Sequence, residues 1–431
     1  YCFLVSLLRS YANENYAFLH GTSAFGYVEG FEREQIELEI KPYKGWNNVE
    51  VSLPQSKVKG YAFTAENYDL LADSPIALGN FDTISYVSSM VLHTVVMIGE
   101  GNYDLLKIQE DFKKISDTQV SMMGDHPSPQ YVHFIYNVTS GGGGLEHLNC
   151  QTSMMNRWNY TNPSAYKGFL GLIAHEYFHL WNVKRVRPIQ LGPFDYNHEV
   201  YTDMLWIAEG ITSYYDDKTL QRMGLYEDEE YLNIIAGQIS RYENTPGKEV
   251  MSLAHSSTLA WVKSYLPNEE SMNNSISYYN KGMIAAVLLD LEIRANSEYS
   301  LDDVMKVLYS DFYKKKGRGF THEEFISVCS KITGKELQPF FDDVVFSTKS
   351  IDYNAMFSPF GLKLTDENDD KNASWSGVVS SNSGGKTTIS NVYAAGPAVE
   401  AGLSVNDEII SINGWRVNET LESHDSKHKV G

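Results

Sequence analysis

The sequence predicts an α+β chain of several domains, with a β-rich start, a mixed middle that becomes helical, and a β-rich end. Short runs of alternating apolar and polar residues fill residues 20–70. Helical patterns follow between residues 100 and 346, and beyond Ser350 short β runs are separated by Asn, Asp, Ser and Gly. At 431 residues the chain has room for about three domains of ordinary size.

Residues 1–70 are expected to form a partial N-terminal β domain. Strands are predicted over 25–30, 34–42 and 46–54, because these runs are rich in β-formers and bounded by Pro and Gly. The chain starts with an apolar run of about eight residues, too short to span a membrane, and without an initiator Met. We therefore expect a truncated N-terminus on a soluble chain, and the sequence leaves cytoplasm and periplasm both open.

Residues 71–350 are expected to form the largest domain, a mixed sheet followed by a helical lobe. Strand patterns at 86–99 and 131–140 flank a helix predicted over 102–116. Further helices are predicted over 164–181, with Ser164 as cap and Pro188 as stop, and over 202–223, 280–296 and 300–313. Residues 351–431 are then expected to form a small β module.

Charge and cysteine content exclude several classes of function. Lys and Arg total 35 and Asp and Glu total 55, so 35 − 55 gives a net charge of −20, which disfavours nucleic acid and anionic membranes as partners. The three cysteines are widely spaced and form no CxxC pair. Any metal ligands must therefore be His and carboxylate side chains, and Cys150 is interpreted as a small buried hydrophobe.

The sharpest local signal is HEYFH at residues 175–179. On a helix, His175 and His179 lie on one face, where both imidazoles can bind one zinc ion with Glu176 beside them. Catalytic zinc usually takes a third protein ligand and keeps one position for water. Glu209, a lone acid in the apolar run LWIAEGITSYY, is the candidate, against the alternative of a glutamate on the helix surface.

Two further segments are candidates for substrate contact. Four glycines, including Gly143 and Gly144, follow a strand pattern and precede Glu146; they could let a substrate backbone lie alongside, although a flexible turn is the simpler interpretation. Tyr278 and Tyr279 open a predicted helix, where paired tyrosines more often serve packing than chemistry.

The segments GLEH, HEYFHLWNVKRVRP, LWIAEGITSYY, LAWVKSYLP and SISYYNKGMIAAVLLDLEIR, in this order and spacing, resemble the glycyl aminopeptidase family. These are zinc metallopeptidases of the gluzincin type related to aminopeptidase N. The resemblance covers roughly residues 20–417. It implies an N-terminal β-sandwich-like segment, a thermolysin-like zinc peptidase domain with a mixed sheet and a helical lobe, and a C-terminal PDZ-like module.

The resemblance also implies roles for single residues. His175, His179 and Glu209 match the zinc ligands of a single Zn²⁺ per chain, and Glu176 matches the general base that activates the attacking water. Glu146 matches the acid that holds the free α-amino group of the substrate, with Gly143 and Gly144 in the same segment, while His147 stands where aminopeptidase N has Asn. Tyr279 matches the transition-state tyrosine, and the choice against Tyr278 depends on that alignment.

The implied activity is hydrolysis of the first peptide bond of peptides with a free N-terminus, with Gly or Ala as the residue removed. The tail from Val392 to Val417 resembles a PDZ domain, whose carboxylate-binding loop would be residues 361–364 and whose ligand would be a C-terminal peptide. Two alternatives stay open: a zinc endopeptidase, and a PDZ peptide-binding protein whose peptidase domain is inactive. No nucleic acid and no membrane insertion are expected.

Overall fold

The computed structural model describes residues 9–366, 375–421 and 423, so the first apolar run and Cys2 lie outside the described residues. The described residues form two compact units. The first takes the described residues within Tyr1–Val200, Thr212–Tyr231 and Leu301–Val328, and the second takes those within Tyr201–Ile211, Leu232–Ser300 and Cys329–Gly431.

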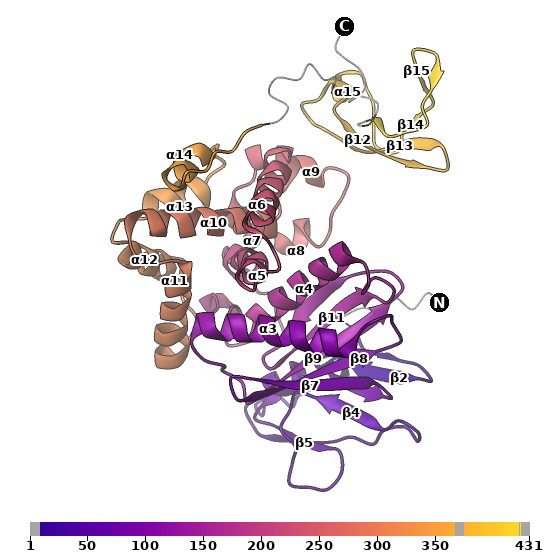
Figure 1. The fold of residues 1–431 in the computed structure, drawn as a ribbon, viewed down its shortest axis with the longest axis vertical. Helices are drawn as coiled ribbons and strands as arrows, with labels where there is room; N and C mark the ends of the chain where they lie inside the picture. The colour runs from indigo at the N-terminus through magenta and orange to yellow at the C-terminus, as the bar shows by residue number, and fades with distance from the viewer. Residues whose placement is uncertain (1–8, 367–374, 422, 424–431) are drawn as a thin grey trace. The chain divides into compact units, whose positions relative to one another are not determined.

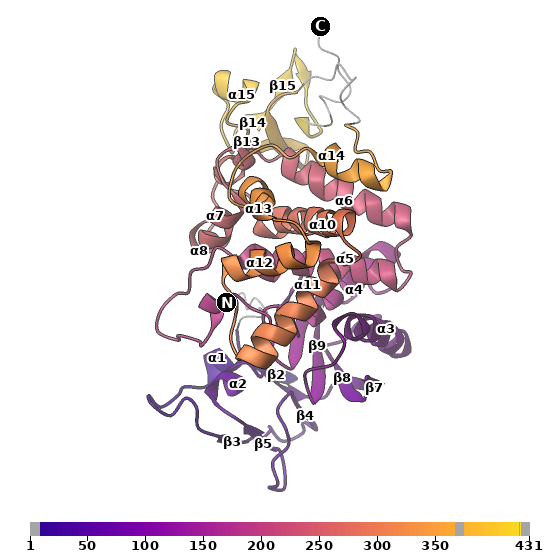
Figure 2. The same cartoon turned by 90° about the vertical axis from the view of Figure 1, so that its left-hand side faces the viewer.

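The first unit holds eleven strands: β1 (Tyr11–Ala12), β2 (Tyr16–Leu19), β3 (Ile36–Glu39), β4 (Asn48–Val51), β5 (Ala62–Ala65), β6 (Ile76–Gly79), β7 (Asp82–Ser88), β8 (Val91–Ile98), β9 (Gln130–Val138), β10 (Gly143–Glu146) and β11 (Cys150–Asn156). Its helices are α1 (Gly21–Ala24), α2 (Tyr68–Ala72), α3 (Leu105–Met123), α4 (Pro163–Phe178), η1 (Ile189–Leu191), α11 (Leu301–Val307) and η4 (Leu308–Lys316). Figure 2 shows α1 and α2 side by side. Three more helices, α5 (Ile211–Arg222), α6 (Asp228–Glu243) and α12 (His322–Thr333), carry residues of both units.

The N-terminal part contains two small sheets, in the orders β1-β2-β6-β4 and β3-β5. Strands β3 and β4 confirm two of the three predicted strands. The third prediction, a strand over residues 25–30, was wrong: the segment contains no strand, and Gly30 (φ 83°) lies in a turn. Strand β3 pairs instead with β5, with Ile36 opposite Ala65.

The four-stranded sheet is buried on both faces. On β2, Ala17 packs into one core with the β4 residue Val49, while Phe18 packs into a second core with Phe134 of β9. The side chains of β6 are also divided between the two cores, because successive side chains of a strand point to opposite faces. The sheet is therefore the middle layer between the β3–β5 pair and the larger sheet.

That larger sheet has the order β10-β11-β9-β8-β7. Strands β8, β9 and β11 run parallel, whereas β7 and β10 pair antiparallel at the two edges, which confirms the predicted mixed sheet. Helices α3 and α4 lie across its other face (Figure 1).

Helix α4 carries the HEYFH segment. It begins with Pro163 at its first position, and the Asn162 side chain accepts a hydrogen bond from the Ala165 amide at 3.0 Å. The predicted cap, Ser164, was wrong, because Asn162 already has the extended backbone of a cap and Pro163 favours the first helical position. The helix ends at Phe178, ten residues before Pro188, and His179 occupies its C-cap.

The second unit contains a helical part followed by a β module. Its helices are η2 (Trp206–Gly210), η3 (Pro246–Glu249), α7 (Leu253–Thr258), α8 (Ala260–Lys263), α9 (Ser271–Asn274), α10 (Tyr278–Asn296), α13 (Gln338–Val344), α14 (Tyr353–Phe357), η5 (Ser358–Phe360) and α15 (Pro397–Glu400). Its strands are β12 (Val378–Ser383), β13 (Lys386–Val392), β14 (Glu408–Ile409), β15 (Ser411–Ile412) and β16 (Trp415–Arg416). Within the described residues, no helix is both long and apolar enough to cross a membrane.

The β module has a core of its own, formed by Val378, Ile389, Ala398, Val417 and Leu421. The predicted carboxylate-binding loop, residues 361–364, follows η5 and contains no strand. Its last residue is tied to α14, since the Leu364 amide donates to the Asn354 side chain at 2.8 Å and the Leu364 carbonyl accepts from it at 3.0 Å.

Candidate active site

The two histidines of α4 are oriented by hydrogen bonds within the first unit. Their ring centroids are 4.8 Å apart. The Nδ1 atom of His175 lies 3.0 Å from the Asp216 carboxylate on α5, and that of His179 lies 3.1 Å from the Asn182 carbonyl oxygen. Because carboxylate and carbonyl oxygens accept, both Nδ1 atoms donate, and the Nε2 atoms are the ones suited to bind a metal.

The Asp216 carboxylate has a second acid beside it. Burial and the charge of Asp216 raise the pKa of Asp217, and burial also raises the pKa of Asp216 against the opposing hydrogen bond from His175.

Three groups of the first unit converge beside α4. One ligand-type atom each of Glu146, Glu176 and His179 lies within 4.8 Å of the others. Glu176 and His179 are buried, and Glu146 is partly buried at the end of β10. Gly144 makes this arrangement possible, because a Cβ atom there would lie 2.2 Å from Oε1 of Glu176.

Strand β10 is an edge strand, and among the described residues it pairs only with β11. Gly143 and Gly144 are therefore on a ladder with one side open to another extended chain. Gly143 and Gly144 lie in β10, whereas Gly141 and Gly142 precede it outside any strand, and the predicted contact with a substrate backbone stays a prediction.

A buried charge network lies behind Glu146. Asp73 accepts hydrogen bonds from Nδ1 of His147 at 3.0 Å, from the Lys184 ammonium at 3.2 Å and from the Leu148 amide at 2.7 Å. Although burial opposes ionisation, Lys184 and these hydrogen bonds lower the pKa of Asp73 to about 2. Burial would lower the pKa of Lys184, but the charges of Asp73 and Glu146 outweigh it and raise that pKa.

His147 is consequently a structural residue in this fold, with 2% of its surface exposed and its Nε2 atom without a hydrogen-bond partner among the described residues. Its ring lies 5.6 Å from that of His20. Cys150 is fully buried, and burial raises the pKa of its thiol, which fits the predicted small hydrophobe.

Histidines and tyrosines cluster around Tyr177 of α4; His93 and His133 are buried, and His126 is partly buried. The Tyr177 hydroxyl lies 2.9 Å from Nε2 of His93, and His93 lies within 5.1 Å of the His126 ring and 6.0 Å of the His133 ring, measured between centroids. Burial lowers the pKa of His93 to about 3 and that of His126 to about 4, and it holds the pKa of His133 well below its ordinary value. At neutral pH the three rings are uncharged.

The second unit carries the remaining predicted site residues. Glu209 is partly buried in η2, a π-helix, a form that is rare and frequently found at functional sites. Helix α10 crosses η2 at Gly210 and Gly282, where a Cβ atom on Gly210 would lie 2.4 Å from the Gly282 Cα atom. This close crossing fixes the start of α10 against the Glu209 segment.

Of the two tyrosines at the start of α10, Tyr279 is the accessible one. Tyr279 is 36% exposed, whereas Tyr278 is 2% exposed and its hydroxyl lies 3.3 Å from that of Tyr265. The Ser277 side chain caps the helix by accepting from the Asn280 amide at 3.3 Å. Tyr279 also lines a pocket of about 530 Å³.

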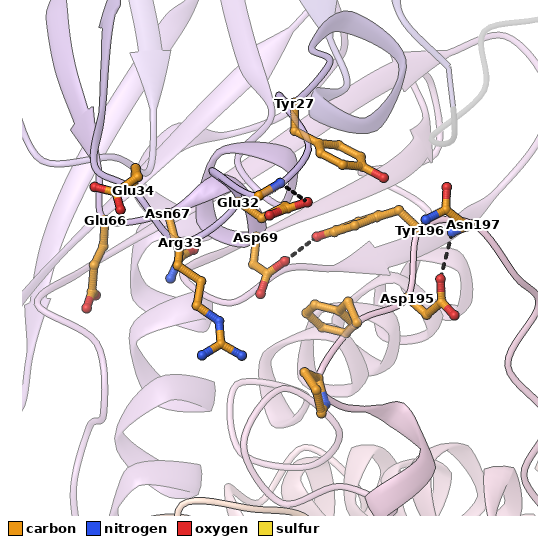
Figure 3. A pocket seen from close by; sticks show the side chains of 13 residues that line it. Tyr27, Glu32, Arg33, Glu34, Glu66, Asn67, Asp69, Asp195, Tyr196 and Asn197 are labelled. Atoms are coloured by element: carbon orange, nitrogen blue, oxygen red, sulfur yellow. Dashed lines mark hydrogen bonds between the residues drawn. The ribbon is translucent and has the colours of Figure 1, made fainter.

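The first unit contains a separate, acidic pocket of about 900 Å³ (Figure 3). Five carboxylates line it: Glu32, Glu34, Glu66, Asp69 and Asp195. The Tyr196 hydroxyl donates a hydrogen bond to Asp69 at 2.5 Å. None of the predicted site residues lines this pocket.

Three family models match the chain: the Peptidase M61 N-terminal domain over residues 1–80, the M61 glycyl aminopeptidase over residues 168–285, and the PDZ domain over residues 356–430. A comparison with curated protein sequences found no match.

Solved structures are also similar. That of an aminopeptidase N family protein from Idiomarina loihiensis is 30% identical to this chain, with a TM-score of 0.89, and the match covers 97% of this chain and 76% of the other. Aminopeptidase A of Legionella pneumophila, solved in complex with aspartic acid, is 15% identical with a TM-score of 0.51, over 78% of this chain and 38% of its own, which shows a shared fold.

Fold and sequence together define a peptidase of the aminopeptidase class with a PDZ domain at its C-terminal end. The chain belongs to the M61 glycyl aminopeptidase family. The family predicted from the HEYFH and EGIT segments is thereby confirmed, and so is the predicted succession of a β domain, a peptidase domain with a mixed sheet, and a PDZ module.

Proposed function

We propose that the chain is a zinc-dependent aminopeptidase that removes small residues, Gly or Ala, from peptides with a free N-terminus. The observation that supports the proposal is the convergence of Glu146, Glu176 and His179, in which the carboxylate proposed to bind the amine lies close to the proposed general base. The family name supports the preference for Gly, and Ala is proposed with it as the other small residue.

His175, His179 and Glu209 would hold one Zn²⁺ ion per chain. The donor set suits zinc, since each histidine is oriented through Nδ1 and Glu209 is a partly buried acid in an otherwise apolar segment. When bound, zinc would supply Lewis-acid polarisation of the scissile carbonyl and a lowered pKa for the attacking water.

The chain's own residues then move the protons. Glu176 accepts the proton of the attacking water and later gives it to the leaving amine, as a general base and then a general acid. Its buried position beside Gly144 favours one orientation of the carboxylate. Tyr279, exposed at the start of α10, donates a hydrogen bond to the carbonyl oxygen as negative charge develops on it.

Glu146 makes the enzyme an aminopeptidase. Its carboxylate pairs with the α-ammonium group of the substrate, which places the first peptide bond next to Glu176. The substrate backbone adds to the open edge of β10 along Gly143 and Gly144. The PDZ module binds a peptide C-terminus, for which residues 361–364 stay the proposed loop.

Glu146→Gln tests the amine anchor. We expect kcat/KM for Ala-arylamide to fall by about 100-fold or more, because the variant keeps the shape of the side chain but loses the charge that holds the ammonium. The small activity on N-acetyl-Ala-arylamide should stay unchanged. Equal losses on both substrates would contradict the anchor.

Elemental analysis tests the metal. The purified protein should bind one zinc ion per chain, and His179→Ala should abolish that binding. A protein that is active without zinc, or that stays inactive when zinc is restored, would contradict the proposal.

A further inference from the structure

The pocket beside Tyr279 has an unusual charge for this chain. It lies wholly in the second unit, between the end of α6, the segment from α8 to α9, and the start of α10. It is lined by Arg241, Tyr242, Thr245, Lys263, Ser264, Tyr265, Pro267, Ser271, Met272, Ser275, Ile276, Ser277, Tyr278, Tyr279 and Asn280.

Arg241 and Lys263 are the charged residues of this lining, and no Asp or Glu is among the described residues that form it. The chain as a whole carries a net charge of −20, and the pocket of Figure 3 is correspondingly lined mainly by acidic residues. The lining of this cavity therefore carries a formal charge of +2, opposite in sign to the net charge of the chain.

Both cations keep hydrogen-bonding capacity for a ligand. The Lys263 ammonium donates to the Asn274 side chain at 3.0 Å and has two further N–H groups. No group in the described part of the chain accepts a hydrogen bond from the Arg241 guanidinium, which is at the exposed end of α6. Arg and Lys in this state bind carboxylates, Arg by two parallel hydrogen bonds.

We propose that this pocket binds a carboxylate of the peptide substrate, namely the C-terminal carboxylate of a short peptide whose first bond is cleaved. The inference rests on the proposed aminopeptidase function. The α-ammonium end is repelled by Arg241 and Lys263 and is assigned to Glu146 instead. The anionic groups that a peptide can offer are its C-terminus and its Asp or Glu side chains.

Tyr279 ties this pocket to the reaction. The proposed transition-state donor forms part of the pocket wall, so a peptide whose scissile carbonyl meets Tyr279 extends along the same surface. A bound carboxylate there would hold the leaving portion of a short substrate and raise kcat/KM for di- and tripeptides above that for longer or blocked chains.

The test compares Ala-Ala-Ala with Ala-Ala-Ala-amide on the wild type, on an Arg241→Gln/Lys263→Met double variant, and on Arg33→Gln. Arg33 is the matched control, because it lines the acidic pocket of the first unit. We expect the wild type and Arg33→Gln to favour the free acid by about tenfold in kcat/KM, and the double variant to lose the preference. The preference should also shrink as salt rises.

Further substrates distinguish the source of the carboxylate and the failure modes. If Ala-Ala-Glu-amide regains the tenfold advantage through the same two residues, the pocket binds a carboxylate but an acidic side chain supplies it. If the wild type hydrolyses Ala-arylamide yet treats acid and amide alike, the carboxylate site is wrong and the aminopeptidase function stands. If the wild type hydrolyses none of these substrates, the proposed function itself fails.

Discussion

Gly144 and Glu176 lie so close that no other amino acid fits at residue 144 without moving the glutamate. An added Cβ atom would be 2.2 Å from Oε1 and 2.3 Å from Cδ of Glu176. The proposed general base, Glu176, therefore packs against the backbone of the edge strand β10.

Gly144→Ala should accordingly reduce kcat by about 100-fold or more, because the displaced Glu176 can no longer accept the proton. Gly142→Ala is the matched control, since an added Cβ atom there meets nothing within 4 Å. Steady-state kinetics on Ala-arylamide, with the thermal midpoint measured alongside, checks the effect. Full activity of Gly144→Ala would show that Glu176 is not held there.

Asp216→Ala should weaken zinc binding by about 10- to 100-fold, because the hydrogen bond to Nδ1 of His175 orients that ligand. Competition with a chelator measures the zinc affinity, and saturating zinc should restore most of the activity. Asp343→Ala, which removes a surface acid paired with Lys349, serves as the control. Unchanged zinc affinity in Asp216→Ala would argue against a role for His175 as a ligand.

Lys184→Met should lower the free energy of unfolding by about 2 kcal/mol, because it leaves the partly buried Asp73 carboxylate without its cation. Lys41→Met is the control and should cost almost nothing, since the Lys41–Glu39 pair is largely exposed. Urea unfolding at pH 7 measures both. Equal, small effects would show that His147 and Leu148 suffice to hold Asp73.

The histidines around Tyr177, His93 and His133 buried and His126 partly buried, predict sensitivity to acid. Their pKa values are lowered in the folded protein, so below the unfolded value of about 6.5 the unfolded chain binds more protons, and stability falls as pH falls toward 4. Each ring contributes up to about 1.4 kcal/mol per pH unit. His126→Leu should flatten the stability–pH curve between pH 6.5 and 4, whereas the exposed His198→Gln should not.

The sequence was most informative where a short motif or a long periodicity carried the signal. The HEYFH helix, the mixed sheet and the start of α10 after Ser277 follow from local spacing. The π-helix at Glu209 did not, because it is defined by backbone hydrogen bonds that span five residues, such as that from the Ile211 amide to the Trp206 carbonyl, and the spacing of apolar residues does not signal them.

Several residues around the site could not be predicted. Asp216 is 41 residues from His175, and Asp73 is 74 and 111 residues from its partners His147 and Lys184, so only the folded chain brings them together. Only one feature of the sequence pointed to Asp216: it is an acidic residue in α5, the helix that directly follows the Glu209 segment. The prediction of a strand over residues 25–30 was wrong because the β-propensity of a segment does not determine which strands pair; β3 pairs with β5.

The four-stranded sheet is buried on both faces, and this burial affects how the molecule unfolds. The predicted domain boundary between residues 70 and 71 runs just ahead of β6, which pairs with both β2 and β4 on the earlier side. Truncation at this boundary would remove β2 and β4, the two neighbours of β6, and would expose Phe134 and the core around it. The N-terminal segment and the peptidase sheet should therefore melt as one cooperative unit, seen as a single calorimetric transition for the pair.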